Sequence, residues 1–142
     1  MYKYEVEVVS VYDGDTFRGY LQVGFGDVKQ GLRAKGVGFR LYGIDTAEVR
    51  GKEKEEGKAT RDHVRALMPN GSKVYIESKK DESGKYGRYL AEVYIPETGL
   101  PESFDKTYTK RIDFDAGNGK TVKCLWLNDY LLDMGMAELE IY

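Results

Sequence analysis

Cysteine and histidine, on which many catalytic and metal sites depend, occur once each in this chain of 142 residues, as Cys124 and His63. A single cysteine excludes a disulfide within the chain and a cysteine-based zinc site. A single histidine excludes a metal site with two imidazole ligands and argues against a Ser-His-Asp mechanism. His63 falls beside the apolar stripe of an expected helix, so we interpret it as a packing or surface residue.

Long apolar runs and an excess of positive charge are also lacking. Charged residues make up 32% of the chain and no apolar run reaches membrane-spanning length, so we expect a soluble protein with no membrane partner. Residues 1–5 contain no apolar segment of the kind found in signal peptides, which favours an intracellular location. The formal net charge is −2, whereas proteins that hold nucleic acid by charge alone are usually basic. Phosphate binding would therefore have to be local or assisted by a metal ion.

The length of the chain and its pattern of apolar residues predict a single domain, residues 1–142, which we expect to be a monomer. Alternation of apolar and polar side chains predicts strands, at residues 2–11, 16–23, from 39 onward, 73–79 and 89–95. Helical periodicity predicts one helix over 58–68 and a shorter one over 128–134, ended by Gly135. Five strands without a repeating strand–helix unit indicate a mainly β, α+β fold, a small Greek-key barrel with packed helices.

Residues 96–123 are irregular and polar in this scheme. Asn118-Gly119 is a hairpin turn signal, and it lies between expected strands at 110–114 and 121–125. We interpret residues 100–121 as a protruding hairpin added to the barrel.

The most informative stretch is the third strand and the polar turn after it, residues 40–48. Arg40 carries a fork-shaped cation suited to phosphate, and Asp45 carries hard oxygens suited to calcium or magnesium. Glu48, three residues further on, could orient or deprotonate a water molecule. Taken alone, this set is more typical of a surface ion-pair cluster. The Asp13–Asp15 pair, in the turn after the first strand, is likewise typical of ordinary turn chemistry.

Three segments in order change that interpretation: Asp-Gly-Asp-Thr at 13–16, Arg-Leu-Tyr-Gly-Ile-Asp-Thr-Ala-Glu at 40–48, and Lys-Tyr-Gly-Arg at 85–88. Together they resemble the staphylococcal nuclease (thermonuclease) family, and residues 128–137 resemble that family's second helix and its exit. The resemblance implies a five-stranded OB-fold-like barrel. It also implies a calcium-dependent endonuclease that hydrolyses DNA and RNA to 3′-phosphate products. The third, C-terminal helix of some members is missing here, and Ala47 stands where the family commonly has proline.

The resemblance also implies a role for each matching residue. Arg40, Glu48 and Arg88 resemble the catalytic residues, with Glu48 activating water and the two arginines stabilising the phosphorane transition state. The resemblance likewise implies three metal ligands: the carboxylates of Asp15 and Asp45 and the main-chain carbonyl of Thr46. The remaining matches are Lys85 and Tyr86 at a nucleotide phosphate and Asp13 as an acid behind the metal ligands.

Two other functions remain open at this point. The same barrel serves in other proteins as a noncatalytic module that binds nucleic acid or protein, typically after catalytic residues have been lost. The third interpretation is an OB-like domain with ordinary surface ion pairs. The presence of Asp15, Arg40, Asp45, Glu48 and Arg88 favours the enzyme.

Overall fold

The computed structural model describes residues 2–22, 36–84 and 88–141, and it contains the five expected strands and the two expected helices. The five strands of the barrel are β1 (Tyr2–Asp13), β2 (Thr16–Gln22), β3 (Val37–Leu41), β5 (Lys73–Gly84) and β6 (Arg88–Pro96). The other elements are β4 (Ile44–Thr46), η1 (Gly51–Glu53), α2 (Lys54–Leu67), η3 (Glu97–Gly99), β7 (Ile112–Gly117), β8 (Lys120–Trp126), α3 (Leu127–Asp133) and β9 (Ala137–Leu139). The predicted fold class, α+β with a five-stranded mixed barrel, is confirmed.

The barrel closes because β3 pairs with two strands. The sheet runs β3-β2-β1-β5-β6, and an additional parallel pairing joins β3 back to β6. Its interior is filled by apolar side chains of alternating strand positions, such as Val6, Phe17, Leu41, Ile76 and Val93, all at most 1% exposed. Closure of this kind leaves no free edge on the barrel strands.

Strand register decides which polar residues meet outside this core. Thr16 lies opposite Arg40 in the β2–β3 pairing, and Arg40 lies opposite Leu90 in the β3–β6 pairing. The β1–β2 turn and the start of β6 are therefore brought to the two sides of Arg40. Asp15 is 25 residues from Arg40 in sequence and Arg88 is 48 residues from it. Strand register brings all three to one end of the barrel.

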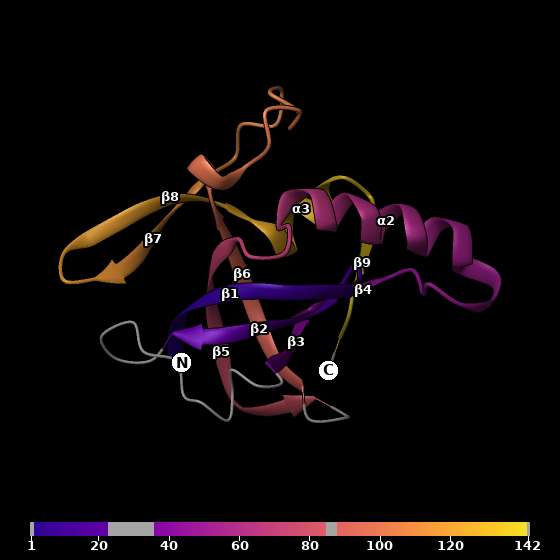
Figure 1. The fold of residues 1–142 in the computed structure, drawn as a ribbon. Coiled ribbons are helices and arrows are strands. Elements are labelled where there is room, and N and C mark those ends of the chain that lie inside the picture. The colour runs from indigo at the N-terminus through magenta and orange to yellow at the C-terminus, as the bar shows by residue number, and fades with distance from the viewer. Residues whose placement is uncertain (1, 23–35, 85–87, 142) are drawn as a thin grey trace.

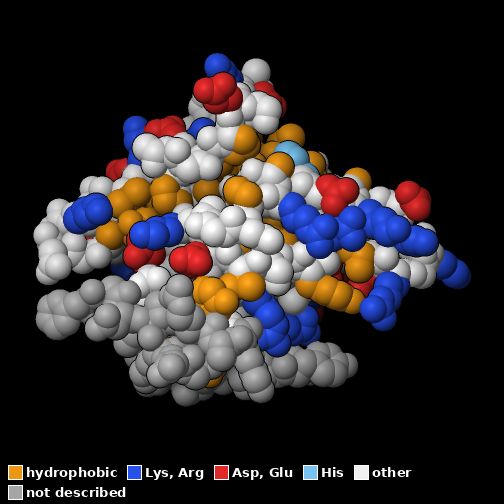
Figure 2. Space-filling model, viewed as in Figure 1, with side chains coloured by type: hydrophobic (Ala, Val, Ile, Leu, Met, Phe, Trp, Pro, Cys, Tyr) orange, Lys and Arg blue, Asp and Glu red, His pale blue; other side chains and the backbone are white. Residues whose placement is uncertain are grey.

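Helix α2 packs against β1 and buries Gly57, Thr60, Val64 and Leu67. Figure 1 shows the helix lying beside the barrel, away from the β7–β8 hairpin. Its start at Lys54 is earlier than the predicted start at residue 58. Figure 2 shows Lys and Arg side chains gathered over the half of this face that carries α2. Among the residues that the structure describes, no helix is long and apolar enough to cross a membrane.

The segment between β6 and α3 does more than form a hairpin. The predicted turn at Asn118-Gly119 is present, with positive φ at both residues. Before the hairpin, however, the chain packs on α3: the Tyr108 and Tyr130 rings meet edge to face at 4.8 Å, and the Tyr108 hydroxyl donates to Asp133 at 2.7 Å. The first half of this segment is therefore anchored to the second helix.

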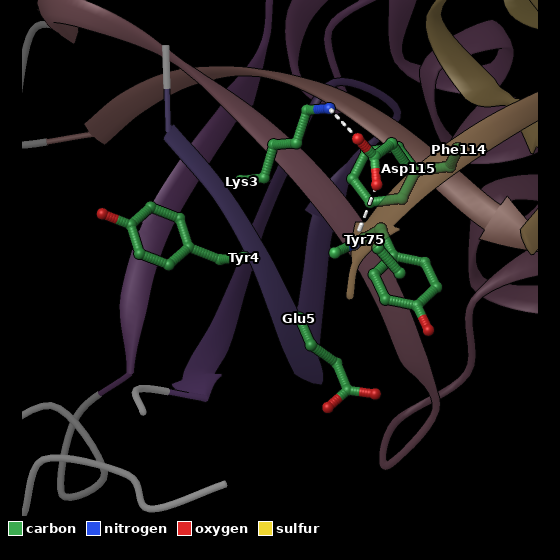
Figure 3. Close-up of a pocket in the computed structure, with 8 residues that line it drawn as sticks. Lys3, Tyr4, Glu5, Tyr75, Phe114 and Asp115 are labelled. Atoms are coloured by element: carbon green, nitrogen blue, oxygen red, sulfur yellow. Dashed lines mark hydrogen bonds and ion pairs between the residues drawn. The ribbon is translucent and has the colours of Figure 1, made fainter. Parts of the chain in front are cut away.

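Strand β7 also leaves a hollow of about 300 Å³ beside β1 and β5 (Figure 3). Phe114 forms part of its wall and stacks on Tyr75 with ring centroids 4.9 Å apart. Lys3 and Asp115 approach to 4.0 Å beside these rings. None of the residues lining the hollow is a predicted site residue, so we attribute it to packing of the hairpin on the barrel.

Candidate active site

The β1–β2 turn fixes the first acidic side chain of the site. The main-chain N–H of Asp15 donates to the Asp13 carboxylate at 3.1 Å, an Asx-type turn of the kind expected from sequence. Gly14 allows close packing there, because a Cβ atom at this position would lie 2.6 Å from the Thr60 methyl group. Asp15 is only 4% exposed. Burial and the neighbouring Asp15 raise the pKa of Asp13 to about 7.

The β3–β4 connection supplies the second acid. Gly43 has φ +79°, a conformation that favours glycine, and it turns the chain between Leu41 and Ile44. Asp45 and Thr46 follow in β4, and the Thr46 N–H donates to Asp15 Oδ2 at 3.1 Å. This bond ties β4 to the β1–β2 turn, so the two aspartates are held beside one another.

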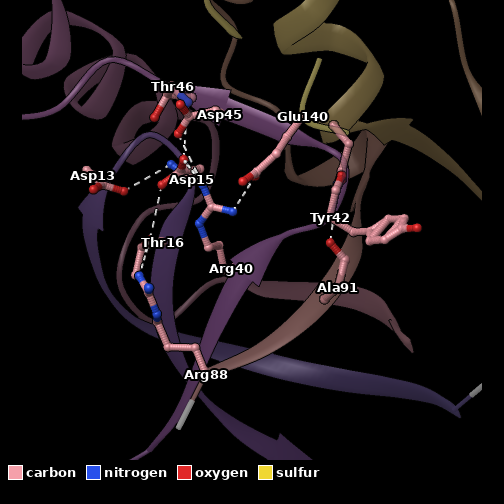
Figure 4. Close-up of polar contacts among 11 residues, drawn as sticks. Asp13, Asp15, Thr16, Arg40, Tyr42, Asp45, Thr46, Arg88, Ala91 and Glu140 are labelled. Carbon is pink, nitrogen blue, oxygen red and sulfur yellow. Dashed lines mark hydrogen bonds and ion pairs between the residues drawn. The ribbon is translucent and has the colours of Figure 1, made fainter. Parts of the chain in front are cut away.

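Arg40 lies at the centre of this arrangement (Figure 4). Its Nη2 is 3.3 Å from Asp15 Oδ2 and 3.1 Å from Asp45 Oδ1, and its Nη1 is 2.7 Å from Glu140 Oε2. The side chain is 16% exposed, so the guanidinium is partly shielded from water. Arg40 thus forms ion pairs with three carboxylates that come from three different parts of the chain.

Arg88 lies on the other side of Thr16. Its Nη1 donates to Thr16 Oγ1 at 3.1 Å, and that hydroxyl donates to Asp15 Oδ1 at 3.1 Å. Gly38 makes room for it, since a Cβ atom there would lie 3.1 Å from Arg88 Cγ. A hollow of about 380 Å³ opens beside Arg88, with Tyr12, Phe17 and Arg18 in its lining. The two arginines therefore flank the Asp15–Thr16 pair.

Glu48 is placed differently from the other predicted catalytic residues. It lies after β4, its side chain is exposed, and no hydrogen bond or ion pair joins it to another of the described residues. Its charge nevertheless acts on Asp45, as one of the smaller causes that raise the pKa of that acid. Glu48 is thus near the cluster but outside its hydrogen-bond network. Lys85 and Tyr86 lie outside the described residues.

Glu140 is a member of the cluster that the sequence did not predict. Strand β9 pairs antiparallel with β4, and the Glu140 N–H donates to the Gly43 carbonyl at 2.9 Å. Apolar and polar residues alternate over 137–141, where Glu140 separates Leu139 from Ile141, and this alternation could have predicted a strand. It could not identify Arg40 as the partner.

The residues predicted to hold a metal ion offer only oxygen ligands, as calcium requires. Asp15 and Asp45 already converge on one cationic atom, Arg40 Nη2. Burial and the negative charge of Asp15 raise the pKa of Asp45, which means that a cation beside this pair would be stabilising. Thr46 adds a buried hydroxyl for which the described residues provide no hydrogen-bond partner.

This donor set is small, and that limits the kind of metal it fits. No group of three or more His, Cys, Asp or Glu side chains in the described part of the chain could hold a metal ion. Two carboxylates and a carbonyl suit a hard cation that keeps water or substrate oxygens as further ligands. They do not suit a closed structural zinc site.

Comparison with known proteins identifies the family of the chain. The family model described as staphylococcal nuclease homologue matches residues 38–142. The chain belongs to this family. The barrel and its two helices are accordingly the OB-like fold of staphylococcal nuclease homologues. The match contains Arg40, Asp45 and Arg88, whereas Asp15 lies before its first residue. No curated protein matches the chain.

Proposed function

We propose that the protein is a calcium-dependent endonuclease that hydrolyses phosphodiester bonds of DNA and RNA and leaves 3′-phosphate products. The observation that carries this proposal is the convergence of the Asp15 and Asp45 carboxylates on Arg40, with Arg88 on the far side of Thr16. Membership of the staphylococcal nuclease homologues, whose name implies nucleic-acid substrates, supports it. The Lys and Arg side chains over α2 (Figure 2) provide local positive charge in a chain of net charge −2.

In the proposed mechanism, Asp15, Asp45 and the Thr46 carbonyl would hold calcium, and the cation would supply charge to neutralise and orient the phosphodiester. Arg40 and Arg88 donate to non-bridging phosphate oxygens and bind the pentacoordinate transition state more strongly than the ground state. Each such contact is worth roughly 3–4 kcal/mol by analogy with an oxyanion-hole donor.

Glu48 is the proposed general base. It accepts a proton from the attacking water, the new P–O bond forms, and the bond from phosphorus to the 5′ oxygen breaks. The departing 5′ oxygen takes up a proton, and the phosphate remains on the 3′ oxygen. The exposed position of Glu48 leaves its carboxylate accessible to water and substrate.

A cleavage assay on plasmid DNA, a single-stranded oligonucleotide and RNA tests the proposal, with calcium and again with excess chelator. We expect cleavage only with calcium, and products whose 3′ ends cannot be extended by a polymerase until a phosphatase has treated them. Arg40→Ala should abolish cleavage. Arg111→Ala is the matched control, since Arg111 pairs with Glu97 beside the β7–β8 hairpin, apart from α2 and from the Arg40 cluster.

Calorimetry separates the metal ligands from the base. Asp45→Ala should weaken calcium binding and cleavage together, whereas Glu48→Gln should lower the rate and leave calcium affinity largely intact. Nucleic-acid binding without cleavage by a folded protein would favour the noncatalytic module. Cleavage that persists in Arg40→Ala would place the activity elsewhere.

A further inference from the structure

The shortest of the Arg40 ion pairs is with Glu140. Nη1 and Oε2 are 2.7 Å apart, compared with 3.1 Å and 3.3 Å for the Nη2 contacts to Asp45 and Asp15. The Arg40 side chain is 16% exposed and that of Glu140 is 34% exposed. This is a charge-assisted hydrogen bond in a partly shielded position, which strengthens it relative to a pair in bulk water.

The main chain holds Glu140 in place. Strand β9 pairs with β4 from Ile44↔Leu139 to Thr46↔Ala137, and the Glu140 N–H then donates to the Gly43 carbonyl at 2.9 Å. The carboxylate is therefore fixed to the same β3–β4 connection that separates Arg40 from Asp45. Little conformational entropy is lost when the ion pair forms, because the backbone on both sides is already ordered.

The three carboxylates differ in what a substrate complex would do to them. Asp15 and Asp45 are the proposed calcium ligands, so a bound cation would take over their charge. Glu140 has no such partner and remains on Nη1. Because Glu140 occupies a donor on Nη1, it competes with a phosphate that binds the guanidinium fork through both terminal nitrogens.

We propose that Glu140 is an internal anion that competes with the substrate phosphate for Arg40 and so lowers substrate affinity. The proposal rests on the proposed function in one respect, namely that Arg40 binds phosphate. A purely structural or positioning role of Glu140 makes the opposite prediction, because loss of the ion pair would then disorder Arg40 and weaken phosphate binding. The two roles are distinguished by the sign of the change in affinity.

Glu140→Gln tests the competition with the least structural change, because the amide oxygen can still accept a bond from Arg40 without the negative charge. Glu138→Gln is the matched control. Glu138 lies two residues before Glu140, on β9, and its side chain is exposed. No ion pair to Glu138 is found in the described part of the structure. The substitution Glu138→Gln changes the net charge by the same amount as Glu140→Gln. Thermal unfolding establishes that both variants fold.

The first measurement is the affinity for inorganic phosphate in the presence of calcium. The titration is monitored by NMR of the arginine side-chain N–H groups, and Arg40→Lys is used to assign the Arg40 signals. We expect Glu140→Gln to bind phosphate about 1.5- to fivefold more tightly, the range expected for a partly exposed ion pair. In the cleavage assay, the KM for a short oligonucleotide should fall by a similar factor while kcat is maintained. Glu138→Gln should match the parent protein in both.

Unchanged or weaker phosphate binding by Glu140→Gln, or a fall in kcat at constant KM, would overturn the proposal. Equal tightening by Glu138→Gln would also overturn it, because the effect would then be one of net charge. Tighter phosphate binding by Glu140→Gln in a protein that cleaves nothing would support competition and reject the nuclease. Cleavage with unchanged phosphate affinity would reject competition and retain the nuclease.

Discussion

Gly57, in the first turns of α2, packs directly on the main chain of Glu48. A Cβ atom at position 57 would overlap the Glu48 carbonyl oxygen and would lie 2.9 Å from the carbonyl oxygen of Ala47. Gly57 is buried, whereas the Glu48 side chain is exposed. The helix therefore fixes the backbone of the proposed general base and leaves its carboxylate accessible.

Gly57→Ala should displace this backbone and slow cleavage by about tenfold to a hundredfold, the range associated with small misplacements of a catalytic group. Calcium affinity should change much less, because Asp15 and Asp45 lie on other elements. Overpacking should also lower the free energy of unfolding by about 1–3 kcal/mol, although alanine has the better helix propensity by about 1 kcal/mol. Kinetics, calorimetry and urea unfolding measure the three effects.

Glu56→Ala is the control for this change, since Glu56 is the preceding residue of α2 and is exposed. It should leave both rate and stability close to those of the parent. A Gly57→Ala protein that is more stable and equally active would show that the first turns of α2 do not position Glu48.

Arg88→Ala should reduce kcat by about a hundredfold to a thousandfold, as expected for loss of one preorganised donor to the transition state. The cost in stability should include about 1 kcal/mol for loss of the partly buried hydrogen bond from Arg88 to Thr16. Arg88→Lys should recover only part of the rate, since an ammonium group cannot form the two parallel bonds of a guanidinium. Steady-state kinetics and thermal unfolding are the measurements, and a stability loss without a rate loss would make Arg88 structural.

The barrel could be predicted from sequence because its strands have a clear alternation, as in Val6 and Val8 or Val74 and Ile76, with the interior positions apolar. The turn at Asn118-Gly119 could be predicted for a similarly local reason. The family resemblance came from short motifs around Asp15, Arg40 and Arg88. Register then brings these motifs together, through the pairings Thr16↔Arg40 and Arg40↔Leu90.

Contacts that depend on distant segments could not be predicted in the same way. Glu140 is 100 residues from Arg40 in sequence, and nothing local to either residue specifies the pair. The packing of Tyr108 on Tyr130 is likewise a tertiary contact, formed by a segment without regular structure. The early start of α2 was missed because residues 54–57 are polar or glycine and show no apolar stripe.

Asn128→Ala should be among the most destabilising polar substitutions. Asn128 is 3% exposed, accepts a bond from the Val93 N–H at 2.9 Å and donates to the Tyr42 carbonyl at 3.0 Å. It thereby joins α3 to β6 and to the turn that carries Asp45. Alanine would leave a buried N–H without its partner, at a cost of about 2–4 kcal/mol by denaturant unfolding. Asp129→Ala, which removes a surface pair with Lys110, should cost less than about 1 kcal/mol; equal losses would contradict the proposed role of Asn128.

His63 provides a prediction about pH whose folded-state pKa can be assigned directly, because it is the only histidine. Its Nε2 is 2.7 Å from the Tyr130 hydroxyl, and burial lowers its pKa below the ordinary value of 6.5. In the unfolded chain the imidazole takes up a proton near pH 6.5, whereas in the folded protein it does so only at lower pH. This contribution to stability is present above pH 6.5 and is lost as the pH falls towards the folded-state pKa.

The His63 imidazole C–H resonances in a pH titration give the folded-state pKa directly, and urea unfolding at pH 8 and pH 5.5 gives the change in stability. Asp13, with a pKa of about 7, titrates over the same interval in both proteins, so the contribution of His63 is the difference between the parent and His63→Gln. Relative to the parent, His63→Gln should lack the part of the stability gain from pH 5.5 to pH 8 that His63 provides, while a polar side chain remains near Tyr130. Cleavage should keep its pH profile in this variant, since His63 contacts Tyr130 on α3 and not the Arg40 cluster. A folded-state pKa at or above 6.5, or a shifted cleavage profile, would contradict the assignment of His63 to packing alone.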